Sequence, residues 1–445
     1  MPQQTRRTFL KVSGGVLGGI AAGTTVAAAE RTDRFIVETG GNDDLGGLTV
    51  VHELAGVDYA VVRGEVSEVE AASGVADYAP DVDVELDDPS PNEDAPTVSE
   101  PSVEDEPGYP LQWDKQALDV PTAHETTKGE GTRVTIIDTG VAAGHPDLDV
   151  NETLSRNFTG DGFGSANAAG GYHGTHVGGI VAASTDNEAG VAGTAPETDL
   201  VDCRVFSPSA LASFGDILAA VVYSAAIDAD VANLSLGAYP IPRQAVGEFF
   251  GKALNRIMTY ANSQGTLLVI AAGNDSADLQ HDKNFISLPN EGAQGVSVSA
   301  TGPIGFGWGD EGVEAPAESP AFYTNYGTNA LDLGAPGGDA DLNAIGTGVP
   351  WYYDLVFNTI AVPQYRTNEE DEVIGIDGYE YSYNWVAGTS MAAPQVAGAA
   401  ALVKSANPDY NANQVESALE AAAEVPEGYD KTYYGAGFLN VVDAL

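Results

Sequence analysis

The chain has 445 residues, of which 43% are hydrophobic, so it can bury a large core and still leave room for accessory segments. Its 65 acidic and 18 basic residues give a formal net charge of -47, which excludes nucleic-acid binding through a basic surface. Because Cys203 is the single cysteine, no intrachain disulfide can form.

The negative charge also predicts the solvent to which the protein is adapted. Such a surface repels itself at ordinary ionic strength, whereas the Debye length falls to about 3 Å at molar salt. We therefore expect a halophilic protein. The alternative is an acidic secreted protein at moderate salt, which activity after dialysis into dilute buffer would favour.

Residues 1–29 are predicted to be an export signal. The segment TRRTFLK, residues 5–11, precedes a charge-free stretch rich in Gly and Ala that ends in three alanines at 27–29. This pattern is typical of a twin-arginine leader. Glycines dilute the apolar run and no longer hydrophobic span follows, so we expect secretion without a stable membrane anchor.

Residues 30–88 are predicted to form a small α+β unit. Phe35–Glu38, Tyr59–Gly64 and Val82–Leu86 have the composition of short strands, and a helix is expected near Val66–Ala72. Residues 89–107 are rich in Pro and acidic side chains and cannot form a core, so they indicate an exposed linker.

From residue 108 to residue 445, strand and helix patterns alternate. Strands are expected at Arg133–Asp138, Leu200–Val205, Val231–Leu236 and Thr266–Ala271, and helices at Gly174–Ala183, Ile217–Ile227, Phe249–Asn262 and Met391–Lys404. This order predicts an α/β fold with a mostly parallel central sheet flanked by helices. Ligands of such folds bind at the carboxyl ends of the strands, where Asp138, Ser235 and Asn274 occur.

Ser390 lies in the segment GTSMAAP, residues 388–394, between a glycine and an alanine-rich helix. A serine at a helix start is usually a cap. Here small neighbours would let a substrate approach, and the positive helix end would favour negative charge near the hydroxyl.

His173 opens the segment HGTHVGG, residues 173–179. A histidine has the pKa needed to accept a serine proton and return it to a leaving amine. The alternative is a metal pair formed with His176, but no glutamate lies between the two and no third ligand is spaced nearby.

Asp138 belongs to an Asp-Thr-Gly segment, which also occurs in aspartic proteases. Those enzymes need two such carboxylates, and the chain has no second copy. The single copy favours an aspartate that orients His173, with a strand-end turn as the structural alternative.

Taken together, the three segments and their Asp, His, Ser order resemble subtilisin-like serine proteases, here of a halophilic, halolysin-like type. The resemblance covers residues 108–445 strongly and residues 30–88 weakly. It implies that Ser390 is the nucleophile, His173 the general base and Asp138 its partner. It further implies that the Asn274 side chain and the Ser390 backbone N–H bind the oxyanion, so that peptide bonds are hydrolysed through an acyl-enzyme.

The same resemblance implies the remaining site residues and partners. Substrate would bind along Ser235, Leu236 and Gly237, with Ala271, Ala272 and Gly273 opposite. Structural Ca²⁺ would bind near Asp147 and Asn187, because oxygen-rich loops suit this ion. Residues 30–88 would be a propeptide that inhibits the enzyme until the precursor processes itself, with a permanent N-terminal domain as the alternative.

Residues 338–384 exceed a minimal subtilisin, and they either shape the cleft or form a loop that only adds solvated charge. We expect a secreted monomeric endopeptidase that acts on proteins or peptides. A catalytically silent binding protein and a narrow processing protease are the alternatives.

Overall fold

The computed structural model describes residues 24–25, 30–40, 44–86, 106–209, 211–282, 284–309 and 312–445. The predicted leader falls almost entirely outside these ranges, and so do residues 89–105 of the predicted linker. Within the ranges described, every helix is too short or too polar to span a lipid bilayer.

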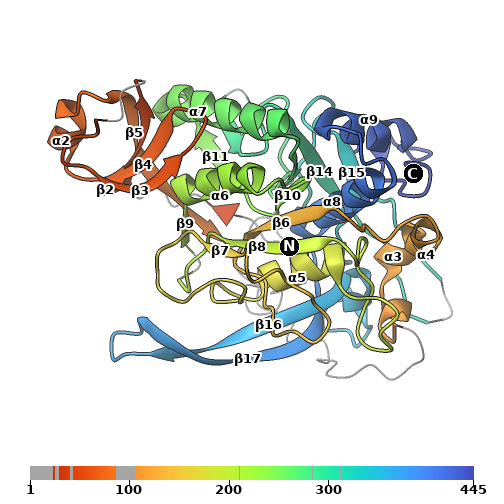
Figure 1. Cartoon of the computed structure of the whole chain (residues 1–445). Helices are drawn as coiled ribbons and strands as arrows, with labels where there is room; N and C mark the ends of the chain where they lie inside the picture. Colours follow the sequence, from red (N-terminus) through yellow and green to blue (C-terminus); the bar gives the residue numbers. More distant parts are fainter. Residues whose placement is uncertain are drawn as a thin grey trace, which may run out of the picture.

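An eight-stranded sheet forms the centre of the larger domain (Figure 1). The strands follow the order β18-β15-β14-β12-β10-β6-β8-β7, and all neighbouring pairs are parallel. They span Gly437–Phe438 (β18), Leu333–Pro336 (β15), Gly295–Thr301 (β14), Leu267–Ala271 (β12), Val231–Leu234 (β10), Arg133–Asp138 (β6), Asp199–Arg204 (β8) and Arg156–Asn157 (β7). The predicted parallel α/β fold is therefore confirmed.

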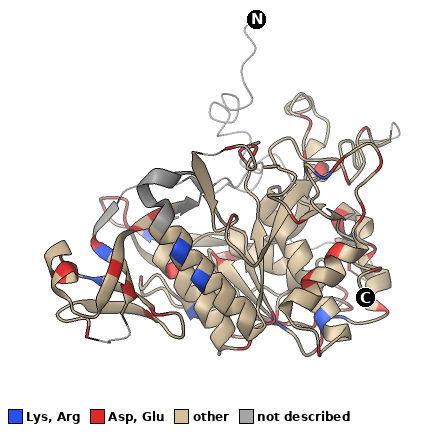
Figure 2. Ribbon diagram, turned by 90° about the horizontal axis from the view of Figure 1, so that it is seen from above, with Lys and Arg blue, Asp and Glu red and all other residues tan. Residues whose placement is uncertain are grey.

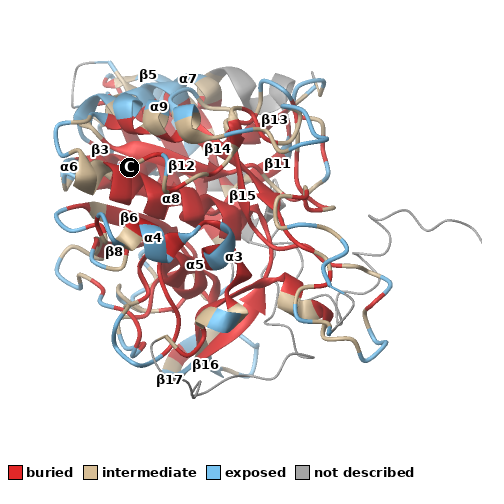
Figure 3. Ribbon diagram, turned by 90° about the vertical axis from the view of Figure 1, so that its right-hand side faces the viewer, coloured by how far each residue is buried: buried red, intermediate tan, exposed pale blue. Residues whose placement is uncertain are grey.

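Helices cover both faces of this sheet, because successive strand residues point to opposite sides. On one face, Ile136 and Val269 share a hydrophobic cluster with α5 and α8. On the other, Ile137 and Ile270 share a cluster with α6 and α7. These helices span His173–Ala182 (α5), Phe214–Ala226 (α6), Arg243–Gln264 (α7) and Thr389–Ala406 (α8), and α9 at Ala412–Ala422 packs on α8. Figure 3 shows that α8 is buried along most of its length.

Shorter elements complete the larger domain. They are η1 (Tyr109–Leu111), α3 (Trp113–Ala117), α4 (Val120–His124) and η2 (Trp351–Asp354), with the antiparallel ribbon of β11 (Ala238–Pro242) and β13 (Phe285–Leu288). The four helices predicted for the larger domain all begin earlier than expected, α5 by one residue and α7 by six. Helix α6 begins at Phe214 because the Ser213 side chain caps it by accepting from Asp216 N at 3.1 Å. Helix α8 begins at Thr389, so Ser390 lies within its first turn.

The N-terminal unit is a separate antiparallel sheet with one short helix, in agreement with the expected α+β composition. Its sheet has the order β1-β5-β2-β4-β3. Strand β1 (Thr24–Thr25) belongs to the predicted leader, and the elements of the unit itself are β2 (Glu30–Thr39), β3 (Thr49–Leu54), β4 (Tyr59–Arg63), α2 (Val66–Ala71) and β5 (Val75–Leu86). Phe35, Val62 and Val69 belong to its own small core.

This unit docks on the larger domain by strand pairing and by charge. Strand β5 pairs antiparallel with β9 (Leu211–Ser213) of the larger domain. Arg34 is buried between Asp81 of its own unit and Asp216 of α6. Two exposed pairs join the unit to α7, Lys252 with Glu38 at 2.5 Å and Arg256 with Asp58 at 3.2 Å. Figure 2 shows the positions of basic residues along this long helix, beside the small domain.

The long segment before Ser390 is an ordered hairpin. Strands β16 (Val356–Thr367) and β17 (Val373–Val386) pair antiparallel and project beneath α5 (Figure 1). The base of the hairpin is buried, and Thr359 Oγ1 donates to Thr175 O of α5 at 2.9 Å. A loop that only adds solvated charge does not describe this segment, because the base of the hairpin is buried, while its outer half, including residues 364–367 and 369–372, is exposed.

Candidate active site

Asp138 ends β6, and His173 opens α5. Both side chains are completely buried, and Asp138 Oδ1 lies 2.8 Å from His173 Nδ1. Asp138 Oδ1 also accepts from Thr139 N at 2.7 Å. Since a carboxylate can only accept, Nδ1 of His173 carries the proton in this pair. This tautomer leaves Nε2 as the basic nitrogen.

A threonine locks the strand end to the helix start. Thr139 Oγ1 donates to Gly171 O at 3.0 Å and accepts from Gly174 N at 2.8 Å. A Cβ atom on Gly174 would lie 2.8 Å from Gly140 N, so only glycine fits at this crossing. The mutual position of Asp138 and His173 is thus fixed by the backbone around them.

Ser390 is the second residue of α8 and is 3% exposed. Its Oγ donates to Ser235 O at 3.2 Å, while Ser235 Oγ donates to Ser390 O at 2.7 Å. The first turn of α8 therefore lies against the residue that follows β10. At this position the hydroxyl lies at the positive end of a long helix.

Asn274 lies just past the end of β12 and is tied to the same helix. Its Oδ1 accepts from both the backbone N and the Oγ1 of Thr389, each at 2.9 Å. These bonds assign the amide orientation, with the oxygen toward Thr389 and the Nδ2 donors on the other side. Because β6, β10 and β12 are neighbours and parallel, Asp138, Ser235 and Asn274 share the carboxyl edge of the sheet.

Asn325 supports this loop and was missed in the sequence. Its Nδ2 donates to Ala272 O at 2.9 Å, and its Oδ1 accepts from Asp275 N at 3.0 Å and Ala277 N at 2.9 Å. It therefore fixes the backbone on both sides of Asn274. No local pattern distinguishes this asparagine from an ordinary turn residue.

The predicted substrate segments lie on neighbouring strand ends. Ser235, Leu236 and Gly237 follow β10, while Ala271 ends β12 and continues into Ala272 and Gly273. The Leu236 side chain is buried in the cluster with α6 and α7, so this segment offers its backbone to a ligand. Gly273 N donates to Thr389 Oγ1 at 3.0 Å, and its φ of 100° favours glycine.

Strand β9 is a further short strand near the candidate site that the sequence did not predict. It pairs with the end of β5, where Asp83 lies opposite Ser213, Val84 opposite Ala212 and Glu85 opposite Leu211. It is therefore an edge to which an extended chain can add as a strand. Its three residues are too few to give a period-2 signal.

His176 faces backbone carbonyls. Its Nε2 lies 3.2 Å from Val356 O and 3.3 Å from Asn384 O, at the base of the hairpin. Burial lowers the pKa of His176 to about 3, so the ring is neutral. These contacts match a buried helix residue and not a metal pair with His173.

The two residues predicted to bind calcium are in contact. Asn187 Nδ2 donates to Asp147 Oδ1, and Val191 N donates to Asp147 Oδ2, each at 2.9 Å. Burial raises the pKa of Asp147 to about 7 and also raises the pKa of the nearby Glu106. A cation would stabilise both carboxylates in their ionised form, so the donors fit Ca²⁺ in chemical type. In the described part of the chain no three His, Cys, Asp or Glu side chains gather to hold a metal, so such a site would also need amide and carbonyl oxygens.

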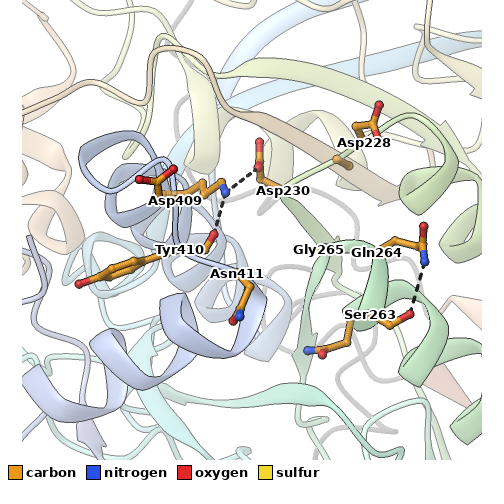
Figure 4. A pocket seen from close by; sticks show the side chains of 11 residues that line it. Asp228, Asp230, Ser263, Gln264, Gly265, Asp409, Tyr410 and Asn411 are labelled. Atoms are coloured by element: carbon orange, nitrogen blue, oxygen red, sulfur yellow. Dashed lines mark hydrogen bonds and ion pairs between the residues drawn. The ribbon is translucent and has the colours of Figure 1, made fainter.

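A polar pocket of about 370 Å³ lies at the opposite edge of the sheet (Figure 4). Asp230 and Lys404 line it, with Lys404 Nζ 3.8 Å from Asp230 Oδ1. Lys404 Nζ also donates to Tyr410 O at 2.7 Å. Asp230 directly precedes β10, whereas Ser235 follows this strand. The pocket and the predicted site therefore lie at opposite ends of strand β10.

Comparisons with known proteins agree with this arrangement. The family model described as the subtilase family matches residues 129–437. Subtilisin DY from Bacillus licheniformis is 32% identical over 314 residues, which cover 71% of this chain and 90% of that protein. Thermitase from Thermoactinomyces vulgaris is 28% identical over 334 residues, which cover 75% of this chain and 95% of that protein.

A solved structure extends the likeness in fold to most of the chain. The epidermin leader peptide processing serine protease from Staphylococcus aureus has a TM-score of 0.68 at 20% identity, covering 92% of this chain and 97% of its own. At this identity the likeness concerns the fold alone. On the family match and the relatives above, the chain belongs to the subtilase family and is a subtilisin-like serine endopeptidase.

Proposed function

We propose that the chain cleaves peptide bonds with Ser390 as nucleophile, His173 as general base and Asp138 as the group that orients the histidine. The buried contact of 2.8 Å between Asp138 Oδ1 and His173 Nδ1 carries this proposal. It prepares the imidazole to accept the serine proton on Nε2 and to deliver it to the leaving amine. The acyl-enzyme on Ser390 is then hydrolysed by water.

Asn274 and the Ser390 backbone N–H are proposed to bind the oxyanion of the tetrahedral intermediate. Thr389 holds the amide oxygen of Asn274, so the Nδ2 donors are fixed before substrate arrives. Donors fixed in advance cost no reorganisation at the moment when charge develops. The positive end of α8 adds to the same effect.

Replacement of the nucleophile tests these roles. We expect Ser390→Ala to cleave a casein-like substrate in molar salt only at the residual rate that remains without a triad. That rate is about 10³–10⁴-fold above the uncatalysed rate in water. The measurement is the initial rate at equal concentration of folded protein. Equal activity in the variant and the parent would remove Ser390 from the mechanism.

The N-terminal unit, residues 30–88, is proposed to be an inhibitory propeptide of a secreted precursor. Pairing of β5 with β9 and the ion pairs to α7 support this role, because they attach the unit to the domain that holds the candidate site. We infer that it leaves by cleavage after export through the twin-arginine route. Incubation of the purified precursor in molar salt, followed by sequencing of the new N-terminus, tests this step, and an intact precursor with full activity would contradict it.

Adaptation to high salt is proposed on the formal net charge of -47. Screening at molar salt removes the repulsion among these carboxylates. We expect the thermal midpoint of unfolding to rise with KCl concentration. Full stability and activity in dilute buffer would contradict the proposal.

Structural Ca²⁺ is proposed to be held by Asp147, Asn187 and Glu106, together with carbonyl oxygens of their loop. When bound, the ion would neutralise the buried carboxylates and stabilise the fold. We expect a chelator to lower the thermal midpoint of unfolding of the parent and to have a smaller effect on Asp147→Asn. An equal effect on both proteins would place the ion elsewhere.

A further inference from the structure

Lys115 is a fully buried lysine in a chain with few bases. It lies in α3, and its Nζ donates three hydrogen bonds to three different parts of the fold. The acceptors are Ile180 O in α5 at 2.9 Å, Thr194 Oγ1 at 2.8 Å and Gln395 Oε1 in α8 at 2.7 Å. One ammonium group therefore joins the helix that His173 opens to the helix that carries Ser390.

A buried countercharge completes this network. Asp114 Oδ2 lies 3.6 Å from Lys115 Nζ and accepts from Gln395 Nε2 at 2.7 Å. Gln395 thus holds the lysine with its oxygen and the aspartate with its nitrogen. All three side chains are 0% exposed, so solvent does not compete for these bonds. Asp114 Oδ1 has no hydrogen-bond partner among the described residues, so the bonds that define the network are those of Lys115 Nζ, Gln395 and Asp114 Oδ2. In the low dielectric of the interior, these directed bonds favour one geometry.

The network lies close behind the candidate site. At ~1.5 Å per residue, Gln395 lies about 7 Å along α8 from Ser390, and Ile180 lies about 10 Å along α5 from His173. Helices of this length move as rods, so a slide of one against the other displaces its first turn. A displacement of about 1 Å at a catalytic group can reduce the rate about 10²-fold.

Stability alone does not explain why a charged group lies at this position. Buried ion pairs can often be replaced by apolar side chains of similar volume without loss of stability, because burial of the charges costs as much as their attraction returns. Apolar contacts are not directional, so an apolar cluster would allow α5 and α8 to pack at several relative positions along their axes. The network fixes one offset.

We propose that Lys115, Asp114 and Gln395 are positioning residues that set the register of α5 against α8, and so the position of His173 relative to Ser390. This inference rests on the proposed roles of these two catalytic residues. It predicts that loss of the network lowers kcat while leaving KM and stability largely unchanged.

The decisive variant removes the whole network at once. Lys115→Met, Asp114→Ala, Gln395→Met and Thr194→Val are combined, so that no buried polar group is left without its partner. We expect an unchanged or higher thermal midpoint, a KM within about twofold and a kcat about 10–100-fold lower. Burst titration with an ester substrate counts the active molecules, so that misfolded protein does not lower the apparent kcat.

A second variant tests the proposal even if the first variant does not fold. Gln395→Met alone keeps the Lys115–Asp114 pair but cuts its link to α8, and we expect a smaller fall in kcat at constant KM. The matched control is Lys404→Met, which removes another lysine contact of α8 on the opposite edge of the sheet and should leave kcat unchanged.

Two results would overturn the proposal. The first is a kcat within about twofold of the parent for a folded network variant, and the second is a fall in activity that follows the loss of folded protein. Ser390→Ala separates this failure from that of the proposed function. If Ser390→Ala is inactive and the network variants are fully active, the positioning role alone is wrong.

Discussion

The two edges of the central sheet hold polar side chains in opposite ways. At the carboxyl edge, Asp138, His173 and Ser390 are at most 3% exposed, and short bonds tie them to the backbone or to each other. At the amino edge, where the strands begin, Asp230 and Lys404 line an open pocket; Asp230 accepts from Arg133 N, and Lys404 donates to the backbone carbonyls of Pro408 and Tyr410. The comparison teaches that the groups proposed for catalysis are held in fixed positions by buried contacts, and that the pocket lies at the other edge of the sheet.

The largest effect at the carboxyl edge is expected for Asp138→Asn. The amide can donate to Nδ1 of His173, which favours the tautomer with the proton on the wrong nitrogen. We expect kcat to fall about 10⁴-fold with little change in KM. Steady-state kinetics on a peptide substrate measure this, with the thermal midpoint as control, and a loss below about tenfold would contradict the assigned role.

Asn274→Ala should have the next largest effect. The loss of a donor to the oxyanion lowers kcat about 10²–10³-fold in subtilisin, and we expect the same range here because Thr389 fixes the amide in advance. Asn274→Asp is the matched variant, because it keeps the acceptor for Thr389 and loses the donors. If the aspartate variant retains full kcat, the donor role is wrong.

The sequence predicted the carboxyl edge better than most of the fold. Parallel strands covered on both faces are continuous apolar runs, so the ends of β6 and β12 were predicted correctly, while β10 ends two residues earlier than expected. Asp138 and Asn274 stand just where two of these runs stop. Their alignment followed from the rule that ligands bind at the carboxyl ends of parallel strands.

Features created by distant contacts could not be predicted. Strand β9 exists as a strand because β5 pairs with it, and the two are far apart in the chain. Asn325 and Lys115 bond to groups that no local pattern places beside them. The sequence does not predict the strands of the hairpin before Ser390, since Pro363, Gly375 and Gly378 interrupt their patterns.

At the amino edge, stability rather than activity should depend on Glu416. This residue of α9 lies near Glu420 and Asp332, and burial raises the pKa of Glu416 to about 7 and that of Asp332 to about 6. Unfolded glutamate titrates near 4.3, so the folded state binds more protons than the unfolded state between about pH 4 and 7. The stability contributed by Glu416 is therefore fully present below about pH 4 and is lost as the pH rises to about 7.

Replacement of Glu416 by Gln should remove this loss. At pH 8 we expect the free energy of unfolding to rise on the order of 1 kcal/mol, well below the full value of the shift because the group is partly exposed and salt screens it. At pH 4 the variant and the parent should be equal. Denaturant unfolding at both pH values measures the difference, and an equal gain at both would exclude titration of Glu416 as the cause.

The smallest effect is expected when the pocket of the amino edge is filled. Ser263 is exposed beside the pocket, and its Oγ bonds to near neighbours in the chain, donating to Tyr260 O at 2.7 Å and accepting from Gln264 Nε2 at 3.5 Å. A tryptophan in place of Ser263 would occupy much of the hollow without touching the buried groups at the other edge. Surface substitutions of this kind change stability by about 0.5 kcal/mol or less. We expect kcat and KM for casein-derived peptides to stay within about twofold of the parent. A large rise in KM would show that substrate reaches the amino edge, and the contrast drawn between the two edges would then be wrong.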